Sequence, residues 1–126
     1  MHKLYITILL IGVSTFGWAQ FNALQQIQVD VVYLASDYLE GRETGTKGEQ
    51  LAADYIASRF SQLGLHPRGD NGTYFQAFPF QEMIDAETET MKKGEGKNVI
   101  GYLHKGAATT IVIGGHYDHL GYGESS

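Results

Sequence analysis

A short run of β-branched and apolar residues, Thr109–Ile113, leads directly into two glycines and then into a group of polar side chains. Continuous apolar runs of this length are typical of strands that are buried on both faces of a sheet. The run therefore predicts a buried strand of an α/β fold. It also places His116 at the carboxyl end of that strand, where α/β folds bind their ligands.

His116 and Asp118 are the candidate functional residues at this strand end. They are two positions apart, so in extended backbone their side chains point to the same side. A carboxylate beside a metal-bound imidazole fixes the tautomer of the ring and raises its basicity. The same spacing also fits plain polar residues in a glycine-rich turn, so the residues alone leave both interpretations open.

Apolar residues at helical spacing predict a first helix over Phe21–Leu39 with one buried face, a break near Ala35 and an end at Gly41. A polar, glycine-rich loop follows, because several glycines in so short a span disfavour both helix and strand. Within this loop Arg42 and Glu43 are candidates for contact with substrate, but we expect them to form a salt bridge that fixes the loop.

A second helix is predicted to begin at Thr46 and to run to about Leu63. Thr46 and Glu49 have the spacing of a capping box, and Gly64 supplies a left-handed stop. The residues expected on the buried stripe of this helix are Leu51, Ala52, Tyr55, Ile56, Phe60 and Leu63.

Further strands are predicted downstream of the second helix. Aromatic residues at strand-like density indicate a strand over Tyr74–Phe80, and the threonines Thr88 and Thr90 indicate an exposed strand. The sequence KKGEGK, residues 92–97, predicts a hairpin turn before a buried strand over Asn98–Leu103.

The N-terminus has the features of a secretory signal peptide over residues 1–19. A cationic start precedes the apolar run Leu4–Val13, and small residues stand at Gly17 and Ala19. The apolar run is shorter than the roughly 20 residues that a bilayer span needs. We therefore expect cleavage after Ala19, a secreted or periplasmic product and no membrane association after cleavage.

Composition narrows the range of partners. The net charge is −5, and Lys92, Lys93 and Lys97 are interleaved with glutamates, so nucleic acid is not an expected partner. The chain has no cysteine, so an exported product relies on no disulfide, and any metal must be held by histidines and carboxylates.

Three segments, taken together and in order, resemble the co-catalytic zinc aminopeptidases of clan MH, which are related to bacterial leucyl aminopeptidases and glutamate carboxypeptidases. They are LASDYLEGRETGTKGEQLAADYIASRFSQLGLHPRGDNGTYFQAFPF, GKNVIGYL and IVIGGHYDHLGYG. The resemblance runs from about Leu34 to the end of the chain. It implies an α/β zinc-exopeptidase (phosphorylase/hydrolase-like) three-layer fold with a mixed sheet. Residues 20–126 would then be the N-terminal part of the catalytic domain, with its first helices and strands only.

The resemblance implies that His116 is the first zinc ligand and that Asp118 is the catalytic-site carboxylate that orients it. It further implies two Zn²⁺ ions, a glutamate general base and hydrolysis of N-terminal residues from peptide or protein substrates. In the family the general base and the other ligands lie beyond the position of Ser126, and Glu40, Glu43 and Glu49 lie in a segment with a structural role. We therefore expect this chain alone to be catalytically incomplete, because even a single catalytic zinc needs three protein ligands.

Two alternatives remain open from the sequence. One is a glutaminyl cyclase-like acyltransferase on the same scaffold. The later metal ligands and the substrate pocket of the family would distinguish such an enzyme from an aminopeptidase. The other is a secreted fragment without catalytic activity, which has a purely structural role. Stoichiometric zinc binding by the folded chain would count against that role.

Overall fold

The computed structural model describes residues 22–85 and 87–123. In this part of the chain helices accompany two small antiparallel sheets, which is a mixed α/β architecture. The contacts divide the chain into two units at Ala35 and Ser36, and each unit is described by itself. The predicted signal peptide, residues 1–19, lies outside the described residues. Among the helices that are described, none has the length and apolar character that a membrane span requires.

The first unit contains a helix over residues 22–34, which ends at the break predicted near Ala35. The prediction of a buried face is wrong for this structure. Leu24, Ile27 and Val31 are each more than half exposed, at 59%, 56% and 60%. Within its own unit, the described residues 22–35 provide no second element against which the helix could bury its apolar stripe.

The second unit begins with the short 3-10 helix η1, Asp37–Arg42, whose Leu39 is completely buried. Gly41 has a φ of +66°, so the predicted left-handed conformation is present, but Gly41 lies inside η1 and does not end the first helix, which already ends at residue 34. Its neighbours Glu40 and Arg42 share this conformation, with φ values of 51° and 52°. Left-handed backbone costs a residue with a Cβ about 1–3 kcal/mol, so other contacts must stabilise this turn.

Helix α2, Lys47–Gln62, begins and ends where the sequence predicts. Thr46 accepts a hydrogen bond from the backbone N–H of Glu49 at its start. At its end Gly64 has a φ of +73°, and the N–H of Leu65 donates to the carbonyl of Phe60 at 3.0 Å. This last bond closes the wide turn that a glycine stop allows.

The buried face of α2 differs from the predicted stripe. The residues that are buried are mainly small ones, Ala52, Ala53 and Ala57, whereas Leu63 is 62% exposed. Small side chains let the neighbouring elements approach the helix backbone closely, and the helix contacts η1, β1 and β3. Hydrophobic spacing identified the helix, but the close approach of its neighbours decides which residues are covered.

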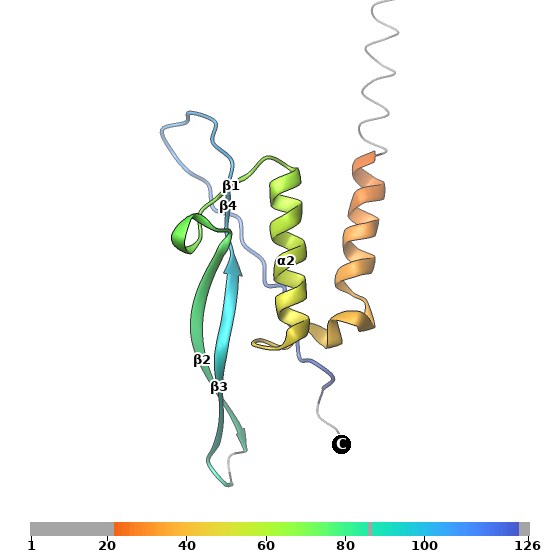
Figure 1. Ribbon diagram of the computed structural model, residues 1–126, viewed down its shortest axis with the longest axis vertical. Coiled ribbons are helices and arrows are strands. Elements are labelled where there is room, and N and C mark those ends of the chain that lie inside the picture. The colour runs from red at the N-terminus through yellow and green to blue at the C-terminus, as the bar shows by residue number, and fades with distance from the viewer. Residues whose placement is uncertain (1–21, 86, 124–126) are drawn as a thin grey trace, which may run out of the picture. The chain divides into compact units, whose positions relative to one another are not determined.

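Two two-stranded antiparallel sheets accompany α2 in the described residues (Figure 1). The larger is a hairpin of β2, Phe75–Asp85, and β3, Thr90–Val99. The smaller pairs β1, His66–Pro67, with β4, Gly101–Tyr102. The short 3-10 helix η2, Asp70–Gly72, lies between β1 and β2. The strand predicted over Tyr74–Phe80 is therefore present and extends further than predicted.

The predicted hairpin turn at residues 92–97 is wrong, because β3 runs straight through them and the turn lies at residues 87–89. Asp85 holds the true turn by accepting hydrogen bonds from the N–H groups of Glu87 and Thr88. Gly94 and Gly96 pair with Phe80 and Phe78 across the hairpin. A Cβ at either glycine would lie within 2.8 Å of the opposite ring, so these glycines serve cross-strand packing and not a turn.

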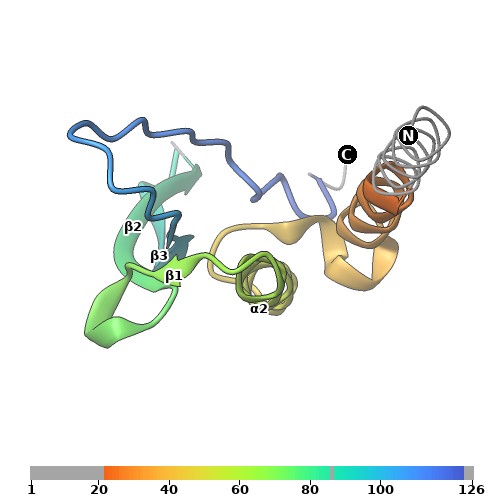
Figure 2. The same cartoon turned by 90° about the horizontal axis from the view of Figure 1, so that it is seen from above.

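The buried strand predicted over residues 109–113 is also absent. The chain there forms no strand, and Ile111, Val112 and Ile113 are 86%, 88% and 93% exposed. Figure 2 shows this part of the chain, in blue, as a trace without an arrow. A strand forms where a neighbouring strand pairs with its backbone, and no described residue forms such a backbone bond with residues 109–113.

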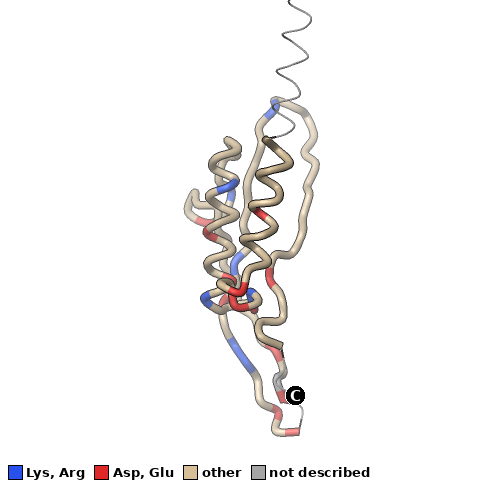
Figure 3. The backbone as a smooth tube through the Cα atoms, turned by 90° about the vertical axis from the view of Figure 1, so that its right-hand side faces the viewer, with Lys and Arg blue, Asp and Glu red and all other residues tan. Residues whose placement is uncertain are grey.

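Charged residues of both signs are mixed along the described chain (Figure 3). On β3 the lysines Lys92, Lys93 and Lys97 alternate with Glu95 and glycines, as the sequence shows. Their local contacts are with carboxylates and aromatic rings: Lys92 pairs with Glu43, and the Lys97 ammonium lies 5.5 Å from the centre of the Phe75 ring.

Candidate functional site

The loop before α2 binds the segment that carries the two candidate residues. The N–H of His119 donates to the carbonyl of Arg42 at 2.9 Å, and the N–H of Gly121 donates to the carbonyl of Gly41 at 3.1 Å. The Arg42 guanidinium donates through Nε to the carbonyl of Tyr117 at 2.7 Å. Three hydrogen bonds thus hold residues 117–121 against a loop more than 70 positions earlier in the sequence.

The left-handed turn of this loop makes the approach possible. A Cβ at Gly41 would lie 2.0 Å from the carbonyl oxygen of Gly121, so only glycine fits there. The left-handed conformations of Glu40 and Arg42 direct successive carbonyls toward the bound segment. The hydrogen bonds to that segment offset the backbone strain, which explains why the turn persists.

Arg42 and Glu43 both fasten the loop, but through partners that are distant in sequence and not through the predicted salt bridge. Glu43 forms an ion pair with Lys92 of β3. Arg42 binds the Tyr117 carbonyl. Each side chain therefore connects the loop to a different part of the unit, which holds the loop more firmly than a local pair would.

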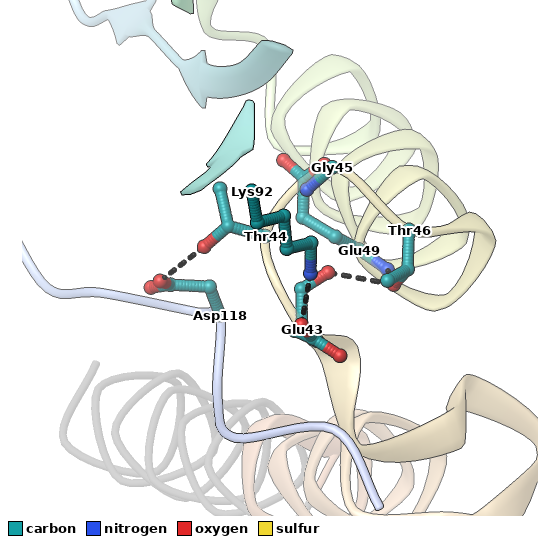
Figure 4. A network of polar contacts seen from close by, with 7 residues as sticks. All are labelled: Glu43, Thr44, Gly45, Thr46, Glu49, Lys92 and Asp118. Carbon is teal, nitrogen blue, oxygen red and sulfur yellow. Dashed lines mark hydrogen bonds and ion pairs between the residues drawn. The ribbon is translucent and has the colours of Figure 1, made fainter. Parts of the chain in front are cut away.

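Glu49 is the buried centre of the polar contacts around the loop. Its side chain is 2% exposed, and Oε1 accepts from the N–H of Lys97 at 3.0 Å and from the Tyr117 hydroxyl at 2.6 Å. Oε2 accepts from the N–H of Gly45 at 3.3 Å (Figure 4). The capping box is therefore modified, since Glu49 reaches back to Gly45 and not to Thr46. Three donors satisfy a carboxylate whose burial would otherwise be costly.

Tyr117 connects this centre to the candidate residues on either side of it. Burial raises the pKa of the Tyr117 phenol far above its usual range. The hydrogen bond to Glu49 and the negative charges of Glu49, Asp118 and Asp54 raise the pKa further. The hydroxyl therefore stays protonated and donates to the Glu49 carboxylate.

His116 and Asp118 face one another, as their spacing predicts. Nδ1 of His116 lies 3.5 Å from Oδ1 of Asp118 and 3.0 Å from the Asp118 carbonyl oxygen. The other carboxylate oxygen of Asp118, Oδ2, accepts a hydrogen bond from the hydroxyl of Thr44 at 2.9 Å (Figure 4). The His116 side chain is 83% exposed, so Nε2 is the ring nitrogen that is available to a ligand from solvent.

These residues fit part of a metal site. An imidazole with an accessible nitrogen and a carboxylate behind its other nitrogen is a common arrangement of a zinc ligand and its orienting group. A catalytic zinc needs three protein ligands, and the described residues contain no group of three or more His, Asp or Glu side chains that could hold a metal ion. The described residues therefore bring together one candidate ligand, His116, and a carboxylate behind it.

Thr44 and Tyr117 also belong to this site, although the sequence did not single them out. The alternation of an extended segment contained the signal for Tyr117, because a residue between two outward-pointing side chains points inward. Nothing local marks Thr44, which is 74 positions from Asp118.

Comparison of the chain with family models, with curated proteins and with solved structures found no significant match.

Proposed function

We propose that this chain provides the first zinc ligand, His116, and its orienting carboxylate, Asp118, to the active site of a secreted zinc aminopeptidase. The arrangement of these two side chains, with Nδ1 of the imidazole facing the carboxylate, is the observation that carries the proposal. The order of the sequence segments, a glycine-rich loop, a helix, and a run ending in His-Tyr-Asp, also supports it.

His116 would bind the metal through Nε2, since Nδ1 faces Asp118. Asp118 would keep the proton on Nδ1 and so keep Nε2 unprotonated. In a complete site zinc would supply Lewis-acid chemistry for hydrolysis of the peptide bond. The loop before α2 would hold Asp118 in place while substrate N-termini bind. The finer fold assignment, a three-layer zinc-exopeptidase sheet of which these elements are the first, belongs to the same proposal.

Zinc titration of the full chain, followed by the ring ¹⁵N resonances of its histidines, tests the metal assignment. We expect the His116 resonances to respond at the lowest zinc concentration, and we expect His116→Ala to weaken the response of the remaining chain to zinc. His66→Ala is the matched control, because His66 lies in β1 and should leave the response unchanged. An unchanged zinc response in His116→Ala would overturn the ligand assignment.

The coding sequence after the codon for Ser126 tests the peptidase assignment. A frame that continues into an aspartate-containing metal segment, a Glu-Glu pair and a later histidine supports a zinc aminopeptidase. A stop codon directly after Ser126 removes any catalytic role for this chain by itself.

A further inference from the structure

Thr44 contacts the Asp118 carboxylate on the side away from His116. Its hydroxyl donates to Oδ2 at 2.9 Å, while Oδ1 lies 3.5 Å from Nδ1 of His116. One carboxylate therefore has one oxygen directed to each neighbour. A hydroxyl that holds one oxygen fixes the rotation of the carboxylate and with it the direction of the second oxygen.

The structure also fixes the direction of the Thr44 hydroxyl. Its methyl group lies against β3, where a Cβ at Gly96 would be 2.7 Å from Cγ2 of Thr44. The χ1 angle of threonine is restricted because its Cβ carries both a methyl group and a hydroxyl. Once packing holds the methyl group, the hydroxyl can point in only one direction. The residues on both sides of Thr44 are fastened as well, since Glu43 pairs with Lys92 and the N–H of Gly45 donates to Glu49 (Figure 4).

We propose that Thr44 is a positioning residue for the His116–Asp118 pair. Thr44 holds the Asp118 carboxylate so that Oδ1 faces Nδ1 of His116, where the Asp118 carbonyl oxygen also lies, and of the two neutral tautomers this favours the one with its proton on Nδ1. Nε2 is then unprotonated and ready to bind a metal. The inference rests on the proposed function, in which Nε2 of His116 is the zinc-binding atom, but its first test needs no metal.

The tautomer of His116 in the full chain without metal is that first test. Two-dimensional ¹⁵N–¹H spectra above the pKa of imidazole, which is about 6.5, distinguish the two neutral tautomers. We expect His116 to carry its proton on Nδ1 in the parent chain and to shift toward the Nε2 tautomer in Thr44→Val. Valine keeps the methyl packing on Gly96 and replaces the hydroxyl with a methyl group of similar size. Thr44→Ser, which restores a hydroxyl, should recover the parent tautomer.

Several controls keep this test decisive. The rings of His66 and His104 should be unaffected in each variant. If Thr44→Val does not reproduce the amide spectrum of the parent chain, Thr44→Ala removes the same hydroxyl without adding any atom. An unchanged His116 tautomer in a folded variant without the hydroxyl would overturn the proposal.

Zinc titration separates this proposal from the proposed function. We expect Thr44→Val to raise the zinc concentration that shifts the His116 resonances about tenfold, the loss typical of removing a group behind a metal ligand, and Thr44→Ser to reverse most of it. If the tautomer follows Thr44 but zinc never affects His116, the positioning role of Thr44 holds and the zinc assignment fails. If zinc binds His116 equally well in all variants and the tautomer does not change, the positioning role fails and the zinc assignment holds.

Discussion

The phenol of Tyr117 donates a hydrogen bond of 2.6 Å to the buried carboxylate of Glu49. This contact joins the start of α2 to the segment between His116 and Asp118. It explains how a segment without regular secondary structure keeps a defined position: Tyr117 points inward, and its two neighbours therefore point outward. The stability of the candidate site and the stability of α2 are consequently linked through one buried carboxylate.

Replacement of Glu49 by alanine should destabilise the second unit by about 3 kcal/mol or more. The substitution leaves the N–H of Lys97 and the N–H of Gly45 without their acceptor and leaves the Tyr117 hydroxyl with only the Lys97 carbonyl, and hydrogen bonds to a charged group each contribute about 1.5–3 kcal/mol. Chemical denaturation measures the effect. Glu95→Ala removes an exposed carboxylate from the neighbouring strand and should stay within about 0.5 kcal/mol of the parent. Equal losses in the two variants would contradict the central role of Glu49.

The stability of the second unit should fall as the pH rises above the ordinary tyrosine pKa of 10.0. In the folded state the pKa of Tyr117 is raised above that value, so the phenol ionises at a lower pH in the unfolded chain than in the folded one. Above pH 10 ionisation therefore favours the unfolded chain, and the free energy of unfolding falls as the pH increases. Below pH 10 the contribution is fully present. Denaturation at a series of alkaline pH values measures this slope.

Tyr117→Phe should flatten the alkaline slope and lower the stability at neutral pH by about 2 kcal/mol, the effect of losing a hydrogen bond to a carboxylate. Tyr38→Phe is the matched control, because Tyr38 is 65% exposed and should leave the slope unchanged. A slope that is the same in Tyr117→Phe and in the parent would show that another group causes the alkaline loss.

The parts of the fold that the sequence predicted correctly are those set by local chemistry. Gly64 ends α2 because a left-handed residue is needed there, and the break near Ala35 appears where a second turn was expected. The hairpin turn was misplaced because Gly94 and Gly96 were interpreted as turn residues. Their role depends on the phenylalanines of β2, which a local pattern does not contain.

In the candidate site, too, the sequence predicted the local arrangement but not the contacts between distant residues. The spacing of His116 and Asp118 predicted that they face one another, since two positions of extended backbone are enough to determine it. The contacts of Asp118 with Thr44 and of Tyr117 with Glu49 join residues 74 and 68 positions apart. Such pairs arise from tertiary packing, so hydrophobic periodicity and motif spacing contain no information about them.

Replacement of Gly48 by alanine tests the packing of η1 against α2. Helix propensity alone predicts a gain of about 1 kcal/mol for this change in a helix interior. In the structure a Cβ at Gly48 would lie 1.9 Å from the carbonyl oxygen of Leu39, so we expect a loss of about 1–3 kcal/mol. Gly114→Ala adds the same methyl group where no atom lies within 4 Å and should have little effect. The sign of the change, measured by denaturation, decides between the two expectations.

The exposed apolar segment Ile111–Ile113 should promote self-association of the chain. Its side chains are 86–93% exposed, and its extended backbone has no strand partner among the described residues, which is the state in which β-branched segments pair with other chains. A charge in the middle of the segment opposes such pairing, so Val112→Lys should slow the rise of light scattering at a given concentration. Ala108→Lys adds the same charge at an exposed position outside the segment and should slow it much less. If Ala108→Lys slows the association as much as Val112→Lys, the position of the lysine does not matter and the apolar segment does not control the association.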